Sequence, residues 1–166
     1  MFTYSVMFLL GISYMDNHQL AQFIVAAKKA TYASQDDNFS LRPLLPGSKY
    51  LAFGRPPFFY CDTYFGMNDF AGQEVVYYQN VPVWSMYYRG GVISAENMSS
   101  IYAFLRKALM TVPLSAPFRG TTSLCEGELQ YVNNYVGEIR NFSGEEYIYQ
   151  STDLVYRLTY IGGLLS

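Results

Sequence analysis

The stretch FFYCDTYFGMNDFAGQEVVYYQNVPVWSMYYRG, residues 58–90, decides the fold that this sequence predicts. Its many aromatic and β-branched residues favour strands over helices. Residues 79–82, Gln-Asn-Val-Pro, are typical of a tight turn, and a turn of this length sets the register of the strands beside it. We therefore expect three consecutive antiparallel strands, with Tyr77 opposite Trp84 and Glu74 opposite Tyr87.

In this register the side chains of the three strands separate into two faces. The mostly apolar face is expected to pack on helices and consists of Phe59, Cys61, Phe65, Val75, Tyr77, Trp84 and Met86. The other face consists of Tyr60, Asp62, Tyr64, Glu74, Tyr78, Tyr87 and Arg89. Tyrosines with a few charged groups are the usual make-up of a site for a small molecule or peptide, so we predict a ligand-binding face here. An ordinary solvated, tyrosine-rich sheet face is the alternative.

Helices are expected on both sides of this stretch. Apolar residues recur at helical spacing from about residue 18 to about residue 33, and again from about residue 95 to about residue 110. Ser94 is expected to cap the second helix, and Lys28 suits the negative pole at the end of the first. The connection over residues 34–57 is long and irregular, and Arg42, Ser48 and Lys49 are candidates to border a site there.

Further strands are expected near residues 50–53 and at about residues 128–140, 145–150 and 154–161, with Glu146 opposite Arg157 in the last hairpin. The predicted fold class is therefore α+β: a single domain with a mostly antiparallel twisted sheet of about six or seven strands packed against two helices. Residues 15–166 are assigned to this domain, and residues 1–14 to an N-terminal extension or an added edge strand. No internal repeat is apparent.

The composition limits the classes of protein to consider. The chain has 166 residues, of which 51% are hydrophobic and 14% charged, and its formal net charge is −2, as expected of one globular domain. The basic residues are scattered, so we expect no direct nucleic-acid binding. The apolar residues 1–14 are too few for a membrane span and lack the features of a signal peptide, so we predict a cytoplasmic protein without a membrane segment.

Metal, cofactor and catalytic signatures are missing from the sequence. Cys61, Cys125 and the single histidine, His18, cannot assemble a zinc site, and neither a phosphate-binding loop nor a dinucleotide-binding motif is present. We expect no metal, no cofactor and reduced cysteines, although a disulfide between the two cysteines stays open. An enzyme is the less favoured interpretation, and the alternative of a hydrolase would use Asp62 and Glu74 as an acid and base pair.

One further residue is a candidate for the site, and one further class of protein is a candidate for the function. Arg119, in the motif PFRG, is a candidate anion-binding group for the same site. A protein-interaction module that uses exposed tyrosines is a third possibility for the function, with a second copy of the chain or a separate regulator protein as the partner.

Several runs together resemble a bacterial domain family of unknown function: FIVAAKKATYA, FFYCDTYFG, FAGQEVVYYQNVPVWSMYYRG, LRKALMTVP, PFRG and GGLL. Members of that family occur alone or C-terminal to a helix-turn-helix of the XRE type in transcriptional regulators. The counterparts of its motif in this chain are Asp62, Tyr64, Gly66, Gly72, Glu74, Trp84, Met86 and Tyr87. The resemblance implies a sensor or effector-binding module; no helix-turn-helix precedes the first expected helix here, so DNA binding is not implied.

Overall fold

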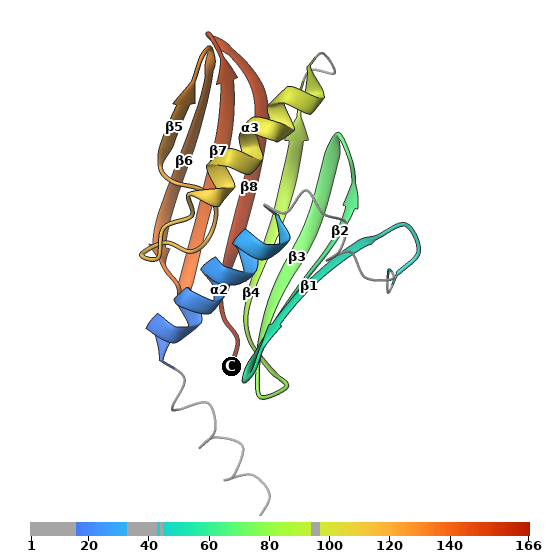
Figure 1. Ribbon diagram of the computed structural model, residues 1–166, viewed down its shortest axis with the longest axis vertical. Coiled ribbons are helices and arrows are strands. Elements are labelled where there is room, and N and C mark those ends of the chain that lie inside the picture. Colours follow the sequence, from blue (N-terminus) through green and yellow to red (C-terminus); the bar gives the residue numbers. More distant parts are fainter. Residues whose placement is uncertain (1–15, 33–42, 44, 94–96) are drawn as a thin grey trace, which may run out of the picture.

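The computed structural model describes residues 16–32, 43, 45–93 and 97–166, which form two helices and eight strands. In chain order these elements are α2 (Asn17–Thr31), β1 (Lys49–Arg55), β2 (Phe58–Gly66), β3 (Asp69–Tyr78), β4 (Val81–Val92), α3 (Met98–Met110), β5 (Ser123–Glu126), β6 (Leu129–Glu138), β7 (Asn141–Gln150) and β8 (Asp153–Leu164). The strands make one antiparallel sheet in the order β1-β2-β3-β4-β8-β7-β6-β5. Both helices lie across the same face of this sheet (Figure 1).

The α+β class and the antiparallel sheet are confirmed, but the sheet has eight strands where six or seven were expected. The extra strand is β5, a four-residue edge strand that pairs only with β6 and is too short to show an alternating pattern. The first helix begins after Asp16, whose side chain accepts a hydrogen bond from the His18 amide at 3.0 Å. The second helix begins at Met98, and the predicted cap Ser94 and residues 1–14 lie outside the described residues.

The structure reveals an internal repeat that the sequence analysis missed. The first unit, α2 with β1–β4, and the second unit, α3 with β5–β8, have the same order of elements, and β4 and β8 pair at the centre of the sheet. Tyr88 lies directly opposite Tyr160 in that pairing. The two units are therefore related by a pseudo-two-fold axis that passes between these tyrosines.

Residue identities and strand register support the same repeat. Matched positions with identical residues are Tyr60 and Tyr131, Tyr64 and Tyr135, Gly66 and Gly137, Phe70 and Phe142, Gly72 and Gly144, Glu74 and Glu146, Tyr88 and Tyr160, and the pairs Gly90-Gly91 and Gly162-Gly163. Both units also carry a register shift at the same place, after Val76 in the first and after Ile148 in the second. The matched residues lie mainly on one face of each half of the sheet.

The predicted pairing of β3 and β4 is wrong. Glu74 lies opposite Met86 where Tyr87 was expected, an error of one residue, and on the turn side of the register shift Tyr77 lies opposite Pro82 where Trp84 was expected. A one-residue slip moves every side chain of a strand to the other face, so Trp84 and Met86 share a face with Glu74. The predicted pairing of Glu146 with Arg157 is wrong for the same reason, because Glu146 lies opposite Leu158.

The helices cover the face that was predicted to be open. Tyr60, Asp62 and Glu74 are each 0% exposed beneath them, together with Trp84 and Met86. The opposite face carries most of the residues predicted for the core, and Phe59 and Phe65 are 39% and 43% exposed there. On this covered face the lysine of α2 and the arginine of the loop after α3 pair with the two buried glutamates, so the buried charges are balanced.

The two cysteines are both free, as expected. Cys61 is half-buried on the face away from the helices, and Cys125 is exposed. They lie in β2 and β5, which stand near opposite edges of the sheet, so the strand order separates them.

Candidate functional site

Two carboxylates lie side by side beneath α2. Asp62 and Glu74 are direct partners in the pairing of β2 with β3, and both are 0% exposed. Lys28 Nζ of α2 contacts both oxygens of Glu74, at 2.8 and 2.6 Å, and also donates to the backbone oxygen of Phe118 at 2.6 Å. The Tyr32 hydroxyl lies 2.5 Å from Asp62 Oδ2 and 3.0 Å from Glu74 Oε1, so it joins the two carboxylates.

The first cluster, which we define as Lys28, Tyr32, Asp62, Glu74 and Tyr88, contains more carboxylates than cations. Burial raises the pKa of Asp62 to about 7, and the charge of Glu74 adds to this rise, while hydrogen bonds from Tyr32 and Tyr88 oppose it. Burial also lowers the pKa of Lys28, although the charge of Glu74 opposes that shift. The pKa of both tyrosines is raised well above the ordinary value, first by burial and then by Asp62, so their hydroxyls stay protonated and act as donors.

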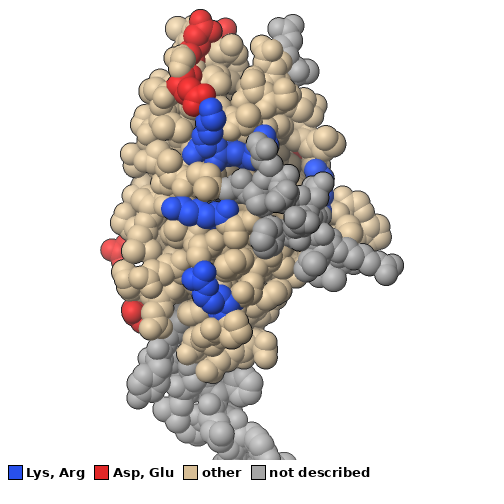
Figure 2. Space-filling model, in the orientation of Figure 1, with Lys and Arg blue, Asp and Glu red and all other residues tan. Residues whose placement is uncertain are grey.

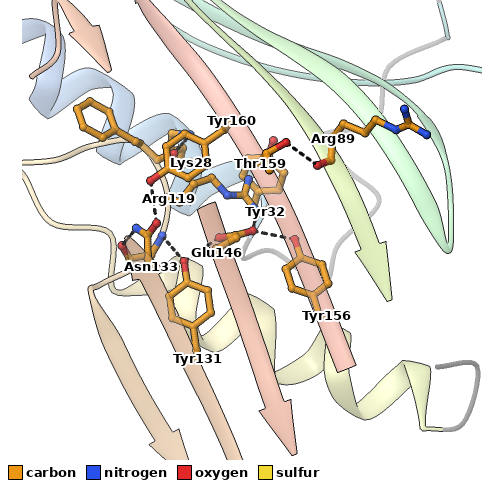
Figure 3. Close-up of polar contacts among 12 residues, drawn as sticks. Lys28, Tyr32, Arg89, Arg119, Tyr131, Asn133, Glu146, Tyr156, Thr159 and Tyr160 are labelled. Carbon is orange, nitrogen blue, oxygen red and sulfur yellow. Dashed lines mark hydrogen bonds and ion pairs between the residues drawn. The ribbon is translucent and has the colours of Figure 1, made fainter. Parts of the chain in front are cut away.

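A second buried cluster occupies the matching place in the second unit. Arg119 Nη2 pairs with Glu146 Oε1 at 2.6 Å, and the hydroxyls of Tyr131 and Tyr156 each donate to Glu146 at 2.7 Å. Figure 3 shows these side chains converging on Glu146. Burial alone would lower the pKa of Arg119, but the charges of Glu146 and Tyr156 raise it well above its ordinary value. This arginine is therefore a buried, permanently charged group.

The two clusters differ at one informative position. Tyr88 donates to Asp62 Oδ1 at 2.7 Å, and its counterpart Tyr160 donates to Asn133 Oδ1 at the same distance. The second unit thus has an amide where the first has a carboxyl. A neutral amide needs no counter-charge when it is buried, whereas Lys28 pairs with Glu74 and not with Asp62, so burial and then the charge of Glu74 raise the pKa of Asp62.

A cavity of about 760 Å³ lies next to the first cluster, between α3, the end of α2 and strands β1–β4. This volume is in the range of small-molecule sites. The described residues that line it are Thr31, Tyr32, Lys49, Leu51, Tyr64, Gly66, Met67, Phe70, Tyr88, Met98, Ser99, Tyr102, Leu105, Arg106, Leu109 and Arg119. Most of these side chains are aromatic or aliphatic, so the cavity suits an organic molecule with a large apolar part.

Glycine at position 72 allows Tyr88 to lie at the boundary between the cavity and the cluster. A Cβ atom built on Gly72 would lie 2.4 Å from the Tyr88 hydroxyl oxygen, which is closer than real Cβ contacts allow. The tyrosine ring can therefore cross the strand at this point and bring its hydroxyl to Asp62. Asp62 and Glu74 themselves are not among the described residues that line the cavity, and they reach it only through Tyr32 and Tyr88.

The charges on the cavity surface are positive. Lys49, Arg106 and Arg119 line it, and none of its described lining residues is an aspartate or glutamate. Arg119 is balanced by Glu146, but neither Lys49 nor Arg106 forms an ion pair with a residue that the structure describes. Figure 2 shows Lys and Arg side chains gathered over the helical face of the molecule, with the acidic side chains of this view near its margins.

The structure brings together only some of the residues predicted for a site. Tyr64 and Arg119 line the cavity, Asp62 and Glu74 lie beneath it, and Tyr60 is buried in the core. Tyr87 and Arg89 lie on the opposite face of the sheet, and Figure 3 shows Arg89 pointing away from the second cluster. Tyr87 and Arg89 were predicted to share the face of Asp62 because the predicted register of β4 was wrong by one residue. Of the loop residues predicted to border a site, Lys49 does so, Ser48 is buried, and Arg42 lies outside the described residues.

Sequence reasoning missed Lys28, Tyr32, Tyr88 and Arg106. The signal that could have found Tyr88 was its match with Tyr160 in the repeat, since both follow a shared glycine and glutamate at equal spacing. Lys28 was expected only to suit the negative pole at the end of the first helix, and its pairing with Glu74, with a side chain 5% exposed, was not foreseen. Nothing in the spacing of α3 distinguishes Arg106 from the neighbouring Lys107, which pairs with Glu126 on the surface.

Fold and site together define a class of protein: an internally duplicated α+β domain with a cation-lined aromatic cavity beside a buried carboxylate pair. The model of the DUF5680 family, a domain of unknown function, matches residues 62–165, and the chain belongs to this family. Neither a curated protein nor a solved structure matches the chain. Among the described residues no helix is long and apolar enough to cross a membrane.

Proposed function

We propose that this protein binds a small organic molecule in the cavity between α3 and strands β1–β4, and that this binding is its function. The observation that carries the proposal is the cavity itself, which combines a volume of about 760 Å³ with aromatic side chains and polar groups of known orientation. Ligand sites usually have this composition: a mostly apolar surface with a few polar groups that fix the orientation of the ligand. A small molecule is favoured over a peptide, because a volume of about 760 Å³ is in the range of small-molecule sites.

The buried clusters support the cavity: Tyr32 and Tyr88 of the first cluster and Arg119 of the second line it, and Asp62 and Glu74 lie beneath it. Tyr88 is held by Asp62 on one side and by Gly72 beneath it, so its ring presents a fixed surface to a ligand. Rigid side chains lose little entropy on binding, which favours affinity. The same geometry gives little support to the hydrolase alternative, because no carboxylate is among the described residues that line the cavity.

A more specific form of this proposal is that the protein acts as a sensor. The resemblance to domains that accompany XRE-type regulators suggests that the bound molecule signals to a separate regulator protein. The end of α2 and the middle of α3 both contact the cavity, through Tyr32 and Arg106. A ligand that contacts both helices can change how they pack on each other, which is the kind of change a partner protein detects.

The test is a thermal-shift and protein-observed NMR screen of a metabolite library against the wild-type chain and two tryptophan variants. Ser99 is exposed and lines the cavity, so Ser99→Trp should place a large ring in it without removing a core side chain. Ser100 is the exposed neighbour outside the cavity lining, and Ser100→Trp is the matched control. We expect ligands that bind the wild type and Ser100→Trp but not Ser99→Trp. Hits that bind all three proteins equally would place binding elsewhere and refute the proposal.

A further inference from the structure

The face of the sheet away from the helices carries a mostly apolar patch in the first unit (Figure 1). The outer patch is defined by outward positions of β2, β3 and β4: Phe59, Cys61, Thr63, Phe65, Ala71, Gln73, Val75, Tyr77, Ser85 and Tyr87. Phe59, Phe65 and Tyr87 are 39%, 43% and 53% exposed. The apolar surface continues onto β8, where Ile161 lies directly opposite Tyr87 and is 59% exposed. Contiguous exposed apolar surface of this kind usually marks an interaction site.

The second unit shows that the fold does not require an apolar outer face. The covered faces of the two units share identical residues, but their outer faces differ. The positions of β6, β7 and β8 that match the outer patch are Gln130, Val132, Asn134, Val136, Ser143, Glu145, Tyr147, Tyr149, Arg157 and Thr159. Gln130 stands where the outer patch has Phe59, and Arg157 stands where it has Ser85. Since the same sheet geometry accepts polar and charged side chains, the apolar character of the first unit indicates a contact with another molecule.

The charge of the outer patch favours a second copy of this chain as that molecule. A two-fold interface brings identical groups close together, so charged residues at its centre would repel each other. None of the residues of the outer patch is charged, and the formal net charge of the chain is only −2. Gln73 Nε2 already donates to the Tyr87 hydroxyl at 2.8 Å, so burial would not leave these two polar groups without a partner.

The first-unit face is also large enough for a specific contact. Strands lie about 4.8 Å apart, so β1–β4 together are about 19 Å wide. A strand of nine residues such as β2 is about 30 Å long. Two copies that pack through this face would bury about 1,200 Å² in total, which is the lower limit for a standard protein–protein interface. Two sheets can pack in this way because their side chains interdigitate when the sheets lie about 10 Å apart.

We infer that the protein forms a homodimer in which the outer patches of two copies pack face to face, with the helices on the outside of the dimer. The polar outer face of the second unit forms the rim of this interface. The inference is independent of the proposed ligand binding, because the cavity is lined by residues of the helices and lies on the other face of the sheet. An interface of this size is expected to give a reversible dimer with a dissociation constant in the micromolar range.

Sedimentation equilibrium of the chain at about 1–200 µM tests the inference. We expect a mass that rises with concentration from 18.9 kDa toward twice that value. The double variant Phe59→Gln, Tyr87→Thr introduces the residues of the second unit, so it should fold, and it should weaken dimerisation at least about 30-fold because aromatic side chains dominate interface energies. Gln73→Glu, which copies Glu145, should weaken it as well by placing like charges on both copies. Val136→Gln, at a valine of the second unit that is 70% exposed, is the control and should change nothing.

The two free cysteines give a second measurement within the same chain. Cys61 lies in the outer patch, whereas Cys125 lies in the edge strand β5 outside it. Alkylation of Cys61 by iodoacetamide should slow as the protein concentration rises through the dissociation constant, because the dimer covers this side chain. Alkylation of Cys125 should proceed at a constant rate. Equal rates for Cys61 at low and high concentration, in a protein that does dimerise, would contradict the proposed interface.

The outcomes also distinguish other occupants of the outer patch. A wild-type chain that stays at 18.9 kDa at every concentration overturns the inference, and the outer patch then contacts a different protein or another part of the same chain. A dimer that persists unchanged in both patch variants overturns it too, because the copies would then meet through another surface. Circular dichroism at about 1 µM checks that each variant is folded, and loss of the dimer in either folded variant, but not in Val136→Gln, supports the inference.

Discussion

Replacing Asp62 with asparagine should remove a large part of the pH dependence of stability. The second unit already contains this arrangement, because Asn133 accepts from Tyr160 at 2.7 Å as Asp62 accepts from Tyr88. In Asp62→Asn the new amide can donate to the Tyr32 oxygen, and Tyr32 can donate to Glu74, so every group in the cluster keeps a partner. The variant should therefore fold, and it isolates the effect of one buried charge.

The magnitude follows from the raised pKa of about 7 for Asp62, against an ordinary value of about 3.9 in the unfolded chain. The folded protein holds this proton more tightly than the unfolded chain does. The contribution to stability is therefore complete below pH 4 and is lost as the pH rises through about 7. Linkage gives a decrease of about 2–3 kcal/mol in the free energy of unfolding between pH 5 and pH 8 from this group. For a chain of this size, that corresponds to a decrease of about 5–10 °C in the midpoint of thermal unfolding.

The assay is urea unfolding followed by circular dichroism, at pH 5, 6, 7 and 8, for the wild type and Asp62→Asn. We expect the variant to lose about 2–3 kcal/mol less than the wild type over this range, and to be the more stable protein at pH 8. Asp69→Asn, which replaces an exposed carboxylate of β3, should keep the wild-type slope. The reasoning is refuted if Asp62→Asn also keeps that slope, because Asp62 would then not be the group that titrates.

Three further substitutions test the packing of the two units. Phe118→Ala should lower the free energy of unfolding by about 3–5 kcal/mol, since it removes a buried ring, whereas Phe59→Ala on the uncovered face should cost less than half as much. Gly72→Ala should cost about 1–3 kcal/mol, because its Cβ would collide with a tyrosine hydroxyl, and it should also weaken ligand binding. Glu146→Gln should cost about 3–5 kcal/mol, because it leaves Arg119 buried without a counter-charge.

Denaturant unfolding measures all three, and each has a result that would contradict it. Equal losses for the two phenylalanine variants would mean that Phe118 is not a core residue. An unchanged stability of Gly72→Ala would show that the tyrosine does not cross the strand there. If Glu146→Gln and the double variant Arg119→Met, Glu146→Gln are equally unstable, the loss does not come from an unpaired charge.

The sequence by itself determined the elements and their order. Apolar residues at helical spacing, such as Phe23 and Ile24 in α2, predict helices because only one side of each helix is buried. Alternating aromatic runs separated by turns predict the antiparallel strands, and their number was missed only at the short β5. The identical residues of the two units are also present in the sequence at nearly constant spacing, and the strand register shows that they occupy matching places in the sheet.

The tertiary structure alone decided which face carries the site. A single extra residue in β4 moved Tyr87 and Arg89 away from Asp62, and a shift of this kind depends on the local twist of the sheet, which residue types do not report. On the covered face Glu74 and Glu146 are paired with Lys28 and Arg119, which lie 46 and 27 residues earlier in the chain. A polar face can be buried only when such distant charges meet it, and that pairing is a property of the folded chain.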